Sequence, residues 1–425
     1  MVSPTIAMQT KEAANSLRCG RPRRHSRFKG GALYMLGRRR YASAVERAQP
    51  WVMVVAGEAS GDQHAAGVVA ALKERDPSLR FFGMGGPRLH AQGVELIHGA
   101  HEISVMGIVE VLPKLPRIWR VLLDLVREAK ARTPVAALLI DVPDFNLRLA
   151  KRLKPLGIPI AWYVAPMAWA WREGRVRQLR ERVDHLLCIL PFEEKFFQDR
   201  GVRATFVGSP VLEQVPPQRP PGEYRRALGL DVDRPTLALL PGSRRSELKR
   251  LLPTLVEVAR REQALHPGLQ IVVPVASGLP RALVTVAFEG RGVAPLFVDG
   301  RAPEAVGACD VSVVASGTAT LEAGLMRRPL VVIYRLSPLT YRVARAMVRL
   351  PFFSLINLLA NRAVVPELLQ DQVTPEAIVA ALEPLWKGGS REALLAGLDE
   401  VRATLGTPGA AGRAADAVLD LISRR

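Results

Sequence analysis

The run Trp51-Val-Met-Val-Val-Ala56, continued by Gly57-Glu-Ala-Ser-Gly-Asp62, decides the fold class of this chain. Its first half is short, apolar and β-branched, which is typical of a buried strand. Its second half has the glycines of a tight turn, and residues 63–74 then carry the pattern of a helix. A strand, a tight turn and a helix in that order open a parallel βαβ unit.

The same alternation runs through the rest of the chain. Further strand-like runs, separated by helix-length segments, occupy residues 80–83, 135–140, 158–164, 185–190, 235–240, 269–275, 295–298, 311–314 and 330–333. A stiff, Pro-rich connector, Val215-Pro-Pro-Gln-Arg-Pro-Pro-Gly222, divides these runs into two groups. The sequence therefore predicts an α/β fold with two Rossmann-like parallel-sheet domains.

The length of 425 residues suits two domains of ordinary size. We expect residues 50–216 to form the first domain and residues 217–400 the second. Two helices are expected after residue 390, at 391–405 and 410–421, both crossing back to the first domain. Residues 401–425 are thus expected to pack on that domain or on a partner chain. Packing on a partner chain would make the protein a homodimer.

The formal net charge of +19 is unevenly distributed. Residues 1–50 hold eleven Lys or Arg and two Glu, among scattered Gly and Pro that leave no apolar face. We therefore expect residues 1–49 to be a basic, disordered extension. No RRM, KH or helix-turn-helix signature is present, so no nucleic-acid partner is expected, and a basic nucleic-acid-binding protein is the distant alternative.

Cysteine spacing and hydropathy exclude two further classes. Cys19, Cys188 and Cys309 are too far apart in sequence for a disulfide framework or a CxxC metal site. No stretch reaches the roughly 18 apolar residues of a membrane-spanning helix. We expect a protein of a reducing compartment that can lie on a membrane without crossing it.

Two turns of the second half predict a clamp for a nucleotide diphosphate, because ligands bind at the carboxyl ends of parallel strands. In LPGSRRSE at 240–247, Ser243 and Arg244 follow a strand, and a guanidinium there can bind phosphate oxygens in pairs. A solvated arginine at a helix start is the alternative for Arg244, and it is the favoured interpretation for Arg245.

In the other turn, SGTATLE at 316–322, the predicted phosphate ligands are Ser316, Gly317 and Thr318, at a helix N-terminus. Glu322 stands where a carboxylate can accept hydrogen bonds from a ribose diol, and a capping-box role is its alternative. The chain has neither a Walker lysine nor a carboxylate cluster for a metal, so we expect no metal and no cofactor.

Carboxylates also follow two strands of the first half. Asp141 and Asp144 lie in IDVPDFN at 140–146, after an entirely apolar strand. A partly desolvated carboxylate has a raised pKa and can take a proton from a hydroxyl nucleophile, so Asp141 is the predicted general base. Capping of the following helix is the alternative for both aspartates. Glu58 is a second candidate to act as the base or to orient the substrate.

Other residues of the first half have two possible roles. Ser60 and Gly61 lie near a helix N-terminus that can receive an oxyanion or a sugar hydroxyl. For Asp62, ligand binding and helix capping stay open. The aromatic residues within 163–171 follow another strand, and they either face a sugar or lipid or belong to the core.

Together these motifs resemble those of the lipid-A-disaccharide synthases of Gram-negative bacteria. The resemblance spans about residues 51–425. It rests on GEASGD at 57–62, GMGGPR at 83–88, MGIVEVL at 106–112, IDVPDFN at 140–146, WAWR at 169–172, LPFE at 190–193, LPGSRRSE at 240–247, SGTATLE at 316–322, NLL at 357–359 and VVPELLQ at 364–370. It implies a metal-independent GT-B glycosyltransferase with the acceptor domain first and the UDP-sugar donor domain second, and it adds Asn357 to the substrate-binding residues.

The resemblance also implies the reaction. The family transfers 2,3-diacylglucosamine from its UDP donor to 2,3-diacylglucosamine 1-phosphate, with inversion, which gives a β-1,6-linked disaccharide 1-phosphate and UDP. It implies a cytoplasmic enzyme, peripheral on the inner face of the inner membrane. Another UDP-sugar enzyme of the same fold, a muramyl-pathway glucosaminyltransferase or a 2-epimerase, is the alternative, although such enzymes should lack the motifs of the first half.

Some residues depart from the family pattern. Ser209 replaces a usual His, Ala165 a usual Ser, and Ile356 and Asn361 a usual Pro and Gly. A mechanism that requires a histidine at 209 is therefore not expected here, whereas Asp141 is unaffected.

Acylated substrates imply contact with a membrane, and two basic amphipathic stretches suit an anionic interface. The apolar stripes are Leu115, Ile118, Trp119, Leu122 and Val126 beside Arg117, Arg120 and Arg127, and Leu339, Val343, Met347 and Leu350 beside Arg342, Arg345 and Arg349. For each stripe, packing in the core is the alternative.

Overall fold

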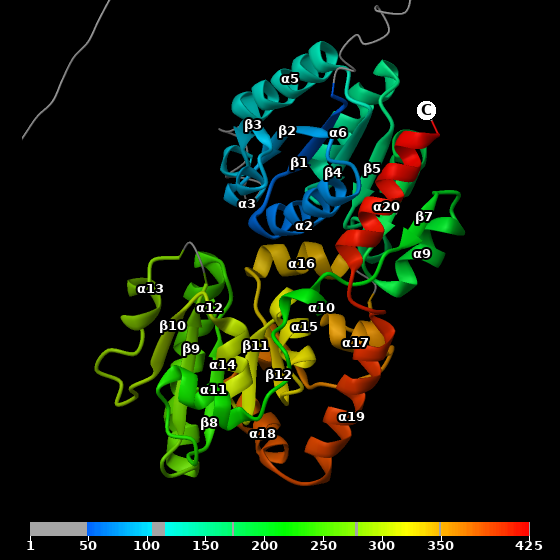
Figure 1. The fold of residues 1–425 in the computed structure, drawn as a ribbon. Coiled ribbons are helices and arrows are strands. Elements are labelled where there is room, and N and C mark those ends of the chain that lie inside the picture. Colours follow the sequence, from blue (N-terminus) through cyan, green and yellow to red (C-terminus); the bar gives the residue numbers. More distant parts are fainter. Residues whose placement is uncertain (1–48, 104–114, 172–173, 277–278, 348–349, 425) are drawn as a thin grey trace, which may run out of the picture. The chain divides into compact units, whose positions relative to one another are not determined.

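The computed structural model describes residues 49–424 except 104–114, 172–173, 277–278 and 348–349 (Figure 1). The predicted N-terminal extension, apart from its last residue, and the motif at 106–112 thus lie outside the described residues. So do Arg172, Arg349 and the side chains of Leu339, Val343 and Met347.

The first half of the described chain is a parallel sheet of seven strands in the order β3-β2-β1-β4-β5-β6-β7. The strands are β1 (Trp51–Ala56), β2 (Arg80–Gly85), β3 (Glu95–Gly99), β4 (Ala136–Ile140), β5 (Ile160–Tyr163), β6 (His185–Cys188) and β7 (Ala204–Phe206). The central strands β1 and β4 are apolar and almost wholly buried, since helices cover both faces of the sheet.

The helices of this half are α2 (Ala59–Arg75), α3 (Pro87–Ala91), η1 (Ala100–Glu102), α5 (Leu115–Arg132), α6 (Pro143–Leu153), η3 (Lys154–Leu156), α7 (Ala168–Trp171), α8 (Gly174–Arg182), α9 (Pro191–Gln198) and α10 (Val211–Gln214). One apolar core joins α5, α6, α8 and α9 to one face of the sheet. A second core joins α2 to the other face.

The second half has a parallel sheet of six strands in the order β10-β9-β8-β11-β12-β13. The strands are β8 (Thr236–Leu240), β9 (Gln270–Val275), β10 (Leu296–Asp299), β11 (Val311–Ala315), β12 (Leu330–Tyr334) and β13 (Glu367–Leu369). The helices are α11 (Pro221–Leu228), α12 (Arg245–Leu265), α13 (Ala282–Thr285), α14 (Ala302–Ala308), α15 (Thr318–Leu325), α16 (Pro338–Met347), α17 (Leu355–Ala360), η4 (Gln370–Gln372), α18 (Pro375–Trp386), α19 (Gly389–Thr404) and α20 (Ala410–Ser423). The expectation of two parallel-sheet α/β domains is confirmed.

The two C-terminal helices behave differently. Helix α20 packs on α2 in the first half, where Ala414, Val418 and Leu421 enter the core beneath it (Figure 1). The prediction that residues 391–405 cross over in the same way is wrong, because α19 buries Leu394 and Leu398 in the core of the second half. Both helices are amphipathic, so their patterns alone do not say which sheet each one covers.

Three strands were absent from the sequence prediction, namely β3, β7 and β13. All three lie at sheet edges and are only partly buried, so they lack the continuous apolar pattern of central strands. Among the described residues, no helix is long and apolar enough to span a bilayer.

Candidate functional site

The turn after β4 holds Asp141 in an unusual backbone conformation. Asp141 and Val142 have φ angles of 50° and 40°, a left-handed region that is costly for residues other than glycine and most of all for β-branched ones. The backbone N–H of Asp141 donates to the carbonyl of Tyr163 on β5, over 3.2 Å. Burial raises the pKa of the Asp141 carboxyl, while a hydrogen bond from the N–H of Val142 lowers it in part. Strain of this kind collects at active sites.

Glu58 ends the turn after β1 at the N-cap position of α2, where its side chain makes no capping hydrogen bond. Burial raises the pKa of its carboxyl, the negative charge of Asp141 raises it further, and the positive charge of Arg244 lowers it. The turns are in contact, because a β-carbon placed on Gly57 would lie 2.8 Å from Cγ2 of Val142. Glu58 thus lies within electrostatic range of two other predicted residues, Asp141 and Arg244.

The remaining residues of GEASGD divide between the surface and the core. Ser60 is exposed in the first turn of α2, and Gly61 is buried against β1 and β4. The Asp62 carboxylate is buried and accepts hydrogen bonds from the N–H groups of Gly86, Arg88 and Leu89. Asp62 therefore caps α3, a helix other than its own, so the capping interpretation holds for this residue.

Asp144 lies away from the buried turn. Its exposed carboxylate accepts a hydrogen bond of 2.6 Å from Arg175 on α8, whose guanidinium is buried. This ion pair ties α6 to α8. The structure thus shows Asp144 in a bracing role, and its predicted role in substrate binding remains untested.

The turn after β8 is organised by Glu247, a residue that the sequence prediction did not single out. Its carboxylate accepts hydrogen bonds from the N–H groups of Ser243 (2.9 Å) and Arg244 (3.2 Å), and it pairs with the Arg244 guanidinium at 3.0 Å. Gly242 has a φ of 106°, and a β-carbon there would lie 2.3 Å from Oε2 of Glu247. Glu247 thus occupies the N-terminus of α12, where a phosphate was expected. The Arg244 side chain remains 46% exposed.

The turn after β11 has the predicted form. The structure starts α15 at Thr318, with Gly317 as its N-cap, and Ser316 donates to the carbonyl of Phe353 over 3.4 Å. Glu322 is the fifth residue of α15, too far along for a capping box, and its carboxylate makes no hydrogen bond to any described residue. Burial raises the pKa of this carboxyl. A half-buried carboxylate with spare acceptor capacity suits a ligand.

Asn357 is buried, and its amide is fully engaged with the protein. The oxygen accepts from the N–H groups of Val364 and Val365, and the nitrogen donates to the carbonyl of Val365 and to Glu367. Glu367 in turn accepts from the N–H groups of Phe353 and Ser354. The observed contacts of Asn357 therefore shape the loop that receives Ser316, and direct substrate contact remains a prediction.

The aromatic segment after β5 meets the LPFE motif through a buried carboxylate. Glu193 accepts hydrogen bonds from the indole N–H of Trp169 (3.1 Å) and from the N–H groups of Ile189 and Leu190. Burial raises the pKa of Glu193 to about 7. Trp169 also makes an edge contact with Phe192, and its side chain is half-buried.

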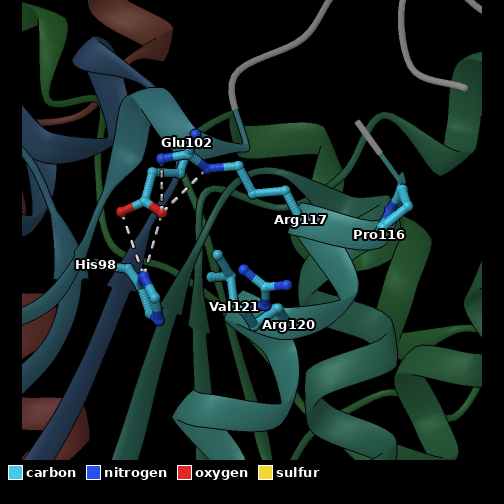
Figure 2. A pocket seen from close by; sticks show the side chains of 6 residues that line it. All are labelled: His98, Glu102, Pro116, Arg117, Arg120 and Val121. Carbon is cyan, nitrogen blue, oxygen red and sulfur yellow. Dashed lines mark hydrogen bonds and ion pairs between the residues drawn. The ribbon is translucent and has the colours of Figure 1, made fainter. Parts of the chain in front are cut away.

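A cavity of about 550 Å³ lies near the carboxyl end of β3 (Figure 2). It is lined by His98, Glu102, Pro116, Arg117, Arg120 and Val121. His98 bridges two carboxylates, with Nδ1 3.2 Å from Glu102 and Nε2 3.2 Å from Asp124 on α5. Arg117 pairs with Glu102 as well. Because these charges satisfy one another, we interpret the cluster as a bridge between β3 and α5. In the described part of the chain, no group of three or more His, Cys, Asp or Glu side chains is arranged to hold a metal ion.

Comparison with known proteins adds a family to this geometry. Residues 52–403 match a family model described as lipid-A-disaccharide synthetase. The chain is 60% identical over 374 residues to lipid-A-disaccharide synthase of Myxococcus xanthus strain DK1622, which covers 88% of this chain and 98% of that protein. It is 42% identical over 375 residues to the enzyme of the same name from Pseudomonas aeruginosa strain LESB58, with the same coverage.

Solved structures with this architecture are more distant in sequence. UDP-GlcNAc 2-epimerase from Neisseria meningitidis, bound to UDP-GlcNAc, aligns with a TM-score of 0.59 at 11% identity, covering 88% of this chain and all of that one. The calicheamicin glycosyltransferase CalG4 aligns with a TM-score of 0.56 at 15% identity, covering 88% and 99%. The expected GT-B fold is thereby confirmed.

Proposed function

This chain belongs to the lipid-A-disaccharide synthase family and is a glycosyltransferase of lipid A biosynthesis, and on that premise we propose that it uses UDP-2,3-diacylglucosamine as donor and 2,3-diacylglucosamine 1-phosphate as acceptor. The acceptor 6-hydroxyl attacks the anomeric carbon of the donor from the face opposite UDP. The new C–O bond forms as the bond to the diphosphate breaks, and the electron pair leaves with UDP. A single displacement inverts the anomeric carbon.

In this proposal, Asp141 takes the proton of the attacking hydroxyl. Its raised pKa makes it a better proton acceptor than an ordinary surface aspartate, and its turn follows the central strand β4. Glu58 lies close enough for the two charges to interact, so it orients the acceptor or shares the proton. The half-buried carboxyl at this strained turn is the single observation that carries the mechanism.

The leaving diphosphate would be stabilised from the second half. Arg244 keeps an exposed guanidinium whose only partner among the described residues is Glu247, so a diphosphate can replace that carboxylate. The N-terminus of α15 at Ser316, Gly317 and Thr318 adds a partial positive charge. Glu322 would accept hydrogen bonds from the ribose diol.

The test is UDP release by the full chain in detergent and EDTA, with both acylated substrates. We expect turnover that needs both substrates and a product with the mass of a disaccharide 1-phosphate. If UDP still raises the melting temperature but no turnover occurs, the clamp is present and the proposed sugar or acceptor is wrong. Conversion of UDP-GlcNAc to its 2-epimer would instead establish the alternative activity.

We also propose that the outer side of α5 binds the inner membrane, on its cytoplasmic face. The predicted stripe divides in two, because Leu122 is buried while Leu115, Trp119 and Leu123 are 41%, 48% and 47% exposed at a spacing of four residues. Arg152 stacks on the Trp119 ring at 4.6 Å, which adds to the positive charge of Arg117, Arg120 and Arg127. An exposed apolar row flanked by arginines suits an anionic bilayer.

Cosedimentation with phosphatidylglycerol vesicles tests the membrane proposal. Glu substituted for both Trp119 and Leu123 should abolish binding, since two charges replace two apolar anchors. The matched control is Val286→Glu, just after α13, where the native side chain is 60% exposed. Equal loss of binding in both variants would refute a specific role for α5.

A further inference from the structure

The strained backbone of the turn after β4 must be held by interactions with neighbouring residues. Asp141 and Val142 are adjacent residues in the left-handed region, a conformation that is costly for residues other than glycine. Such conformations persist only where the surrounding structure determines them fully. The turn ends on the candidate general base, so whatever holds its backbone also sets the direction of that carboxylate.

The side chain that holds this turn is Asn146, in the first half of α6. Asn146 is fully buried, and its Nδ2 donates to the carbonyl of Ile140 over 3.1 Å and to that of Asp141 over 2.8 Å. The amide orientation is determined chemically, because both partners can only accept and a flipped amide would set oxygen against oxygen.

The Asn146 side-chain amide makes no other hydrogen bond in the described part of the chain. Its Oδ1 is buried and meets no hydrogen-bond donor there. An unpaired buried oxygen is destabilising, so leucine or another apolar residue would suit a purely structural position better. The two donated hydrogen bonds are what this side chain contributes.

Backbone hydrogen bonds hold the end of this turn, and the Asn146 side chain holds the carbonyl groups of Ile140 and Asp141. The N–H groups of Phe145 and Asn146 donate to the carbonyl of Val142, one residue beyond the base. The Val142 side chain rests against Gly57. These contacts hold the end of the turn, whereas the peptide groups on either side of the Asp141 α-carbon are held by the N–H to Tyr163 and by Asn146.

We propose that Asn146 is a positioning residue for the general base: by holding the carbonyl groups of Ile140 and Asp141, it keeps the Asp141 carboxylate directed at the acceptor hydroxyl. This inference rests on the proposed function. Asn146 touches no substrate in this role and acts only through Asp141. A displacement of the base by about 1 Å is enough to reduce a rate about a hundredfold.

The test uses two substitutions with opposite electrostatic effects. Asn146→Ala removes the hydrogen bonds and admits water, which lowers the pKa of Asp141 towards its ordinary value, so the acid limb of the kcat profile should move to lower pH. Asn146→Asp has nearly the same volume but adds a negative charge, so that limb should move to higher pH. The other charged groups around the turn, Glu58 and the Asp144–Arg175 pair, are unchanged in both variants.

In both variants we expect kcat to fall about a hundredfold near neutral pH, with the acceptor KM changed less than about threefold. The control is Thr236→Val, which removes another buried hydrogen bond to a backbone carbonyl, at the start of β8. It should cost similar stability and leave the kcat profile in place. Circular dichroism and thermal melts show whether each variant is folded.

Two outcomes would overturn the inference. One is a folded Asn146→Ala protein with wild-type kcat and an unmoved acid limb. The other is a shift in the same direction for both substitutions, since that would reflect general loosening. A wild-type protein that is inactive with the proposed substrates refutes the proposed function instead. In that case the positioning proposal, which rests on that function, falls with it, whereas an active wild type beside an unaffected Asn146→Ala variant overturns the positioning proposal alone.

Discussion

The turns after β4 and after β8 both follow central parallel strands, but their construction is opposite. The first half-buries its functional side chain, Asp141, on a strained backbone held by contacts from other elements. The second exposes Arg244 and closes on itself through Glu247, four residues from Ser243 in sequence. A base needs a fixed direction and a shifted pKa, whereas a diphosphate ligand needs accessible charge that can exchange partners. The difference therefore matches a division between the chemical step and nucleotide binding.

The largest expected effect is on the buried turn. Asp141→Asn keeps the size of the side chain but removes the base, so kcat should fall by about 10²- to 10⁴-fold. UDP affinity should stay within about twofold of wild type, because the substitution leaves the second half intact. Steady-state kinetics and UDP titration calorimetry measure the two quantities. An active Asp141→Asn enzyme would remove this residue from the mechanism.

Substitutions in the turn after β8 should change the affinity for UDP. Arg244→Ala removes charged hydrogen bonds worth about 1.5–3 kcal/mol, so the Kd for UDP should rise about ten- to a hundredfold. The neighbouring Arg245→Ala serves as the matched control and should bind UDP as the wild type does. If both variants bind equally well, the diphosphate does not sit on this turn.

The pH dependence of activity separates the two carboxylates of the first half. Asp141 raises the pKa of Glu58, and by reciprocity the charge of Glu58 raises that of Asp141. Activity needs the base deprotonated and is lost as the pH falls through its pKa, so Glu58→Gln should move the acid limb of the kcat/KM profile to lower pH. A profile that collapses at every pH would instead identify Glu58 as the base.

The smallest effect is expected from Glu247→Gln. The amide oxygen still accepts from the N–H groups of Ser243 and Arg244, and an exposed ion pair contributes less than about 1 kcal/mol, so the melting temperature should hardly change. Without the competing negative charge, UDP should bind a few-fold more tightly. Weaker UDP binding would show that Glu247 organises the turn for the ligand and does not compete with it.

Much of the fold was predictable because its signals are local. Alternating apolar runs and helical segments predicted all the central strands, and the turn at 316–318 was correctly placed at the N-terminus of a helix. The edge strand β3 and the packing of α19 in the second half were not predictable, since a half-exposed strand lacks an apolar pattern and the pattern of an amphipathic helix does not specify the sheet that it covers. The predicted apolar stripe of α5 does not lie on one exposed side, because Leu122 faces the core and the more exposed Leu123 had not been included.

Residue types and their spacing alone determined the α/β class, the chemistry of each turn and the choice of Asp141, Glu58 and Arg244. Turn glycines, apolar periodicity and ionisable groups are all local features of the sequence. The tertiary structure alone decided how these groups are paired and how far they are buried. In the folded chain, Asp62 accepts hydrogen bonds from the start of α3, Asp144 pairs with Arg175, and Asn146 donates to the turn that carries Asp141. Pairing and desolvation depend on neighbours from other elements, and those neighbours exist only once the sheets are packed.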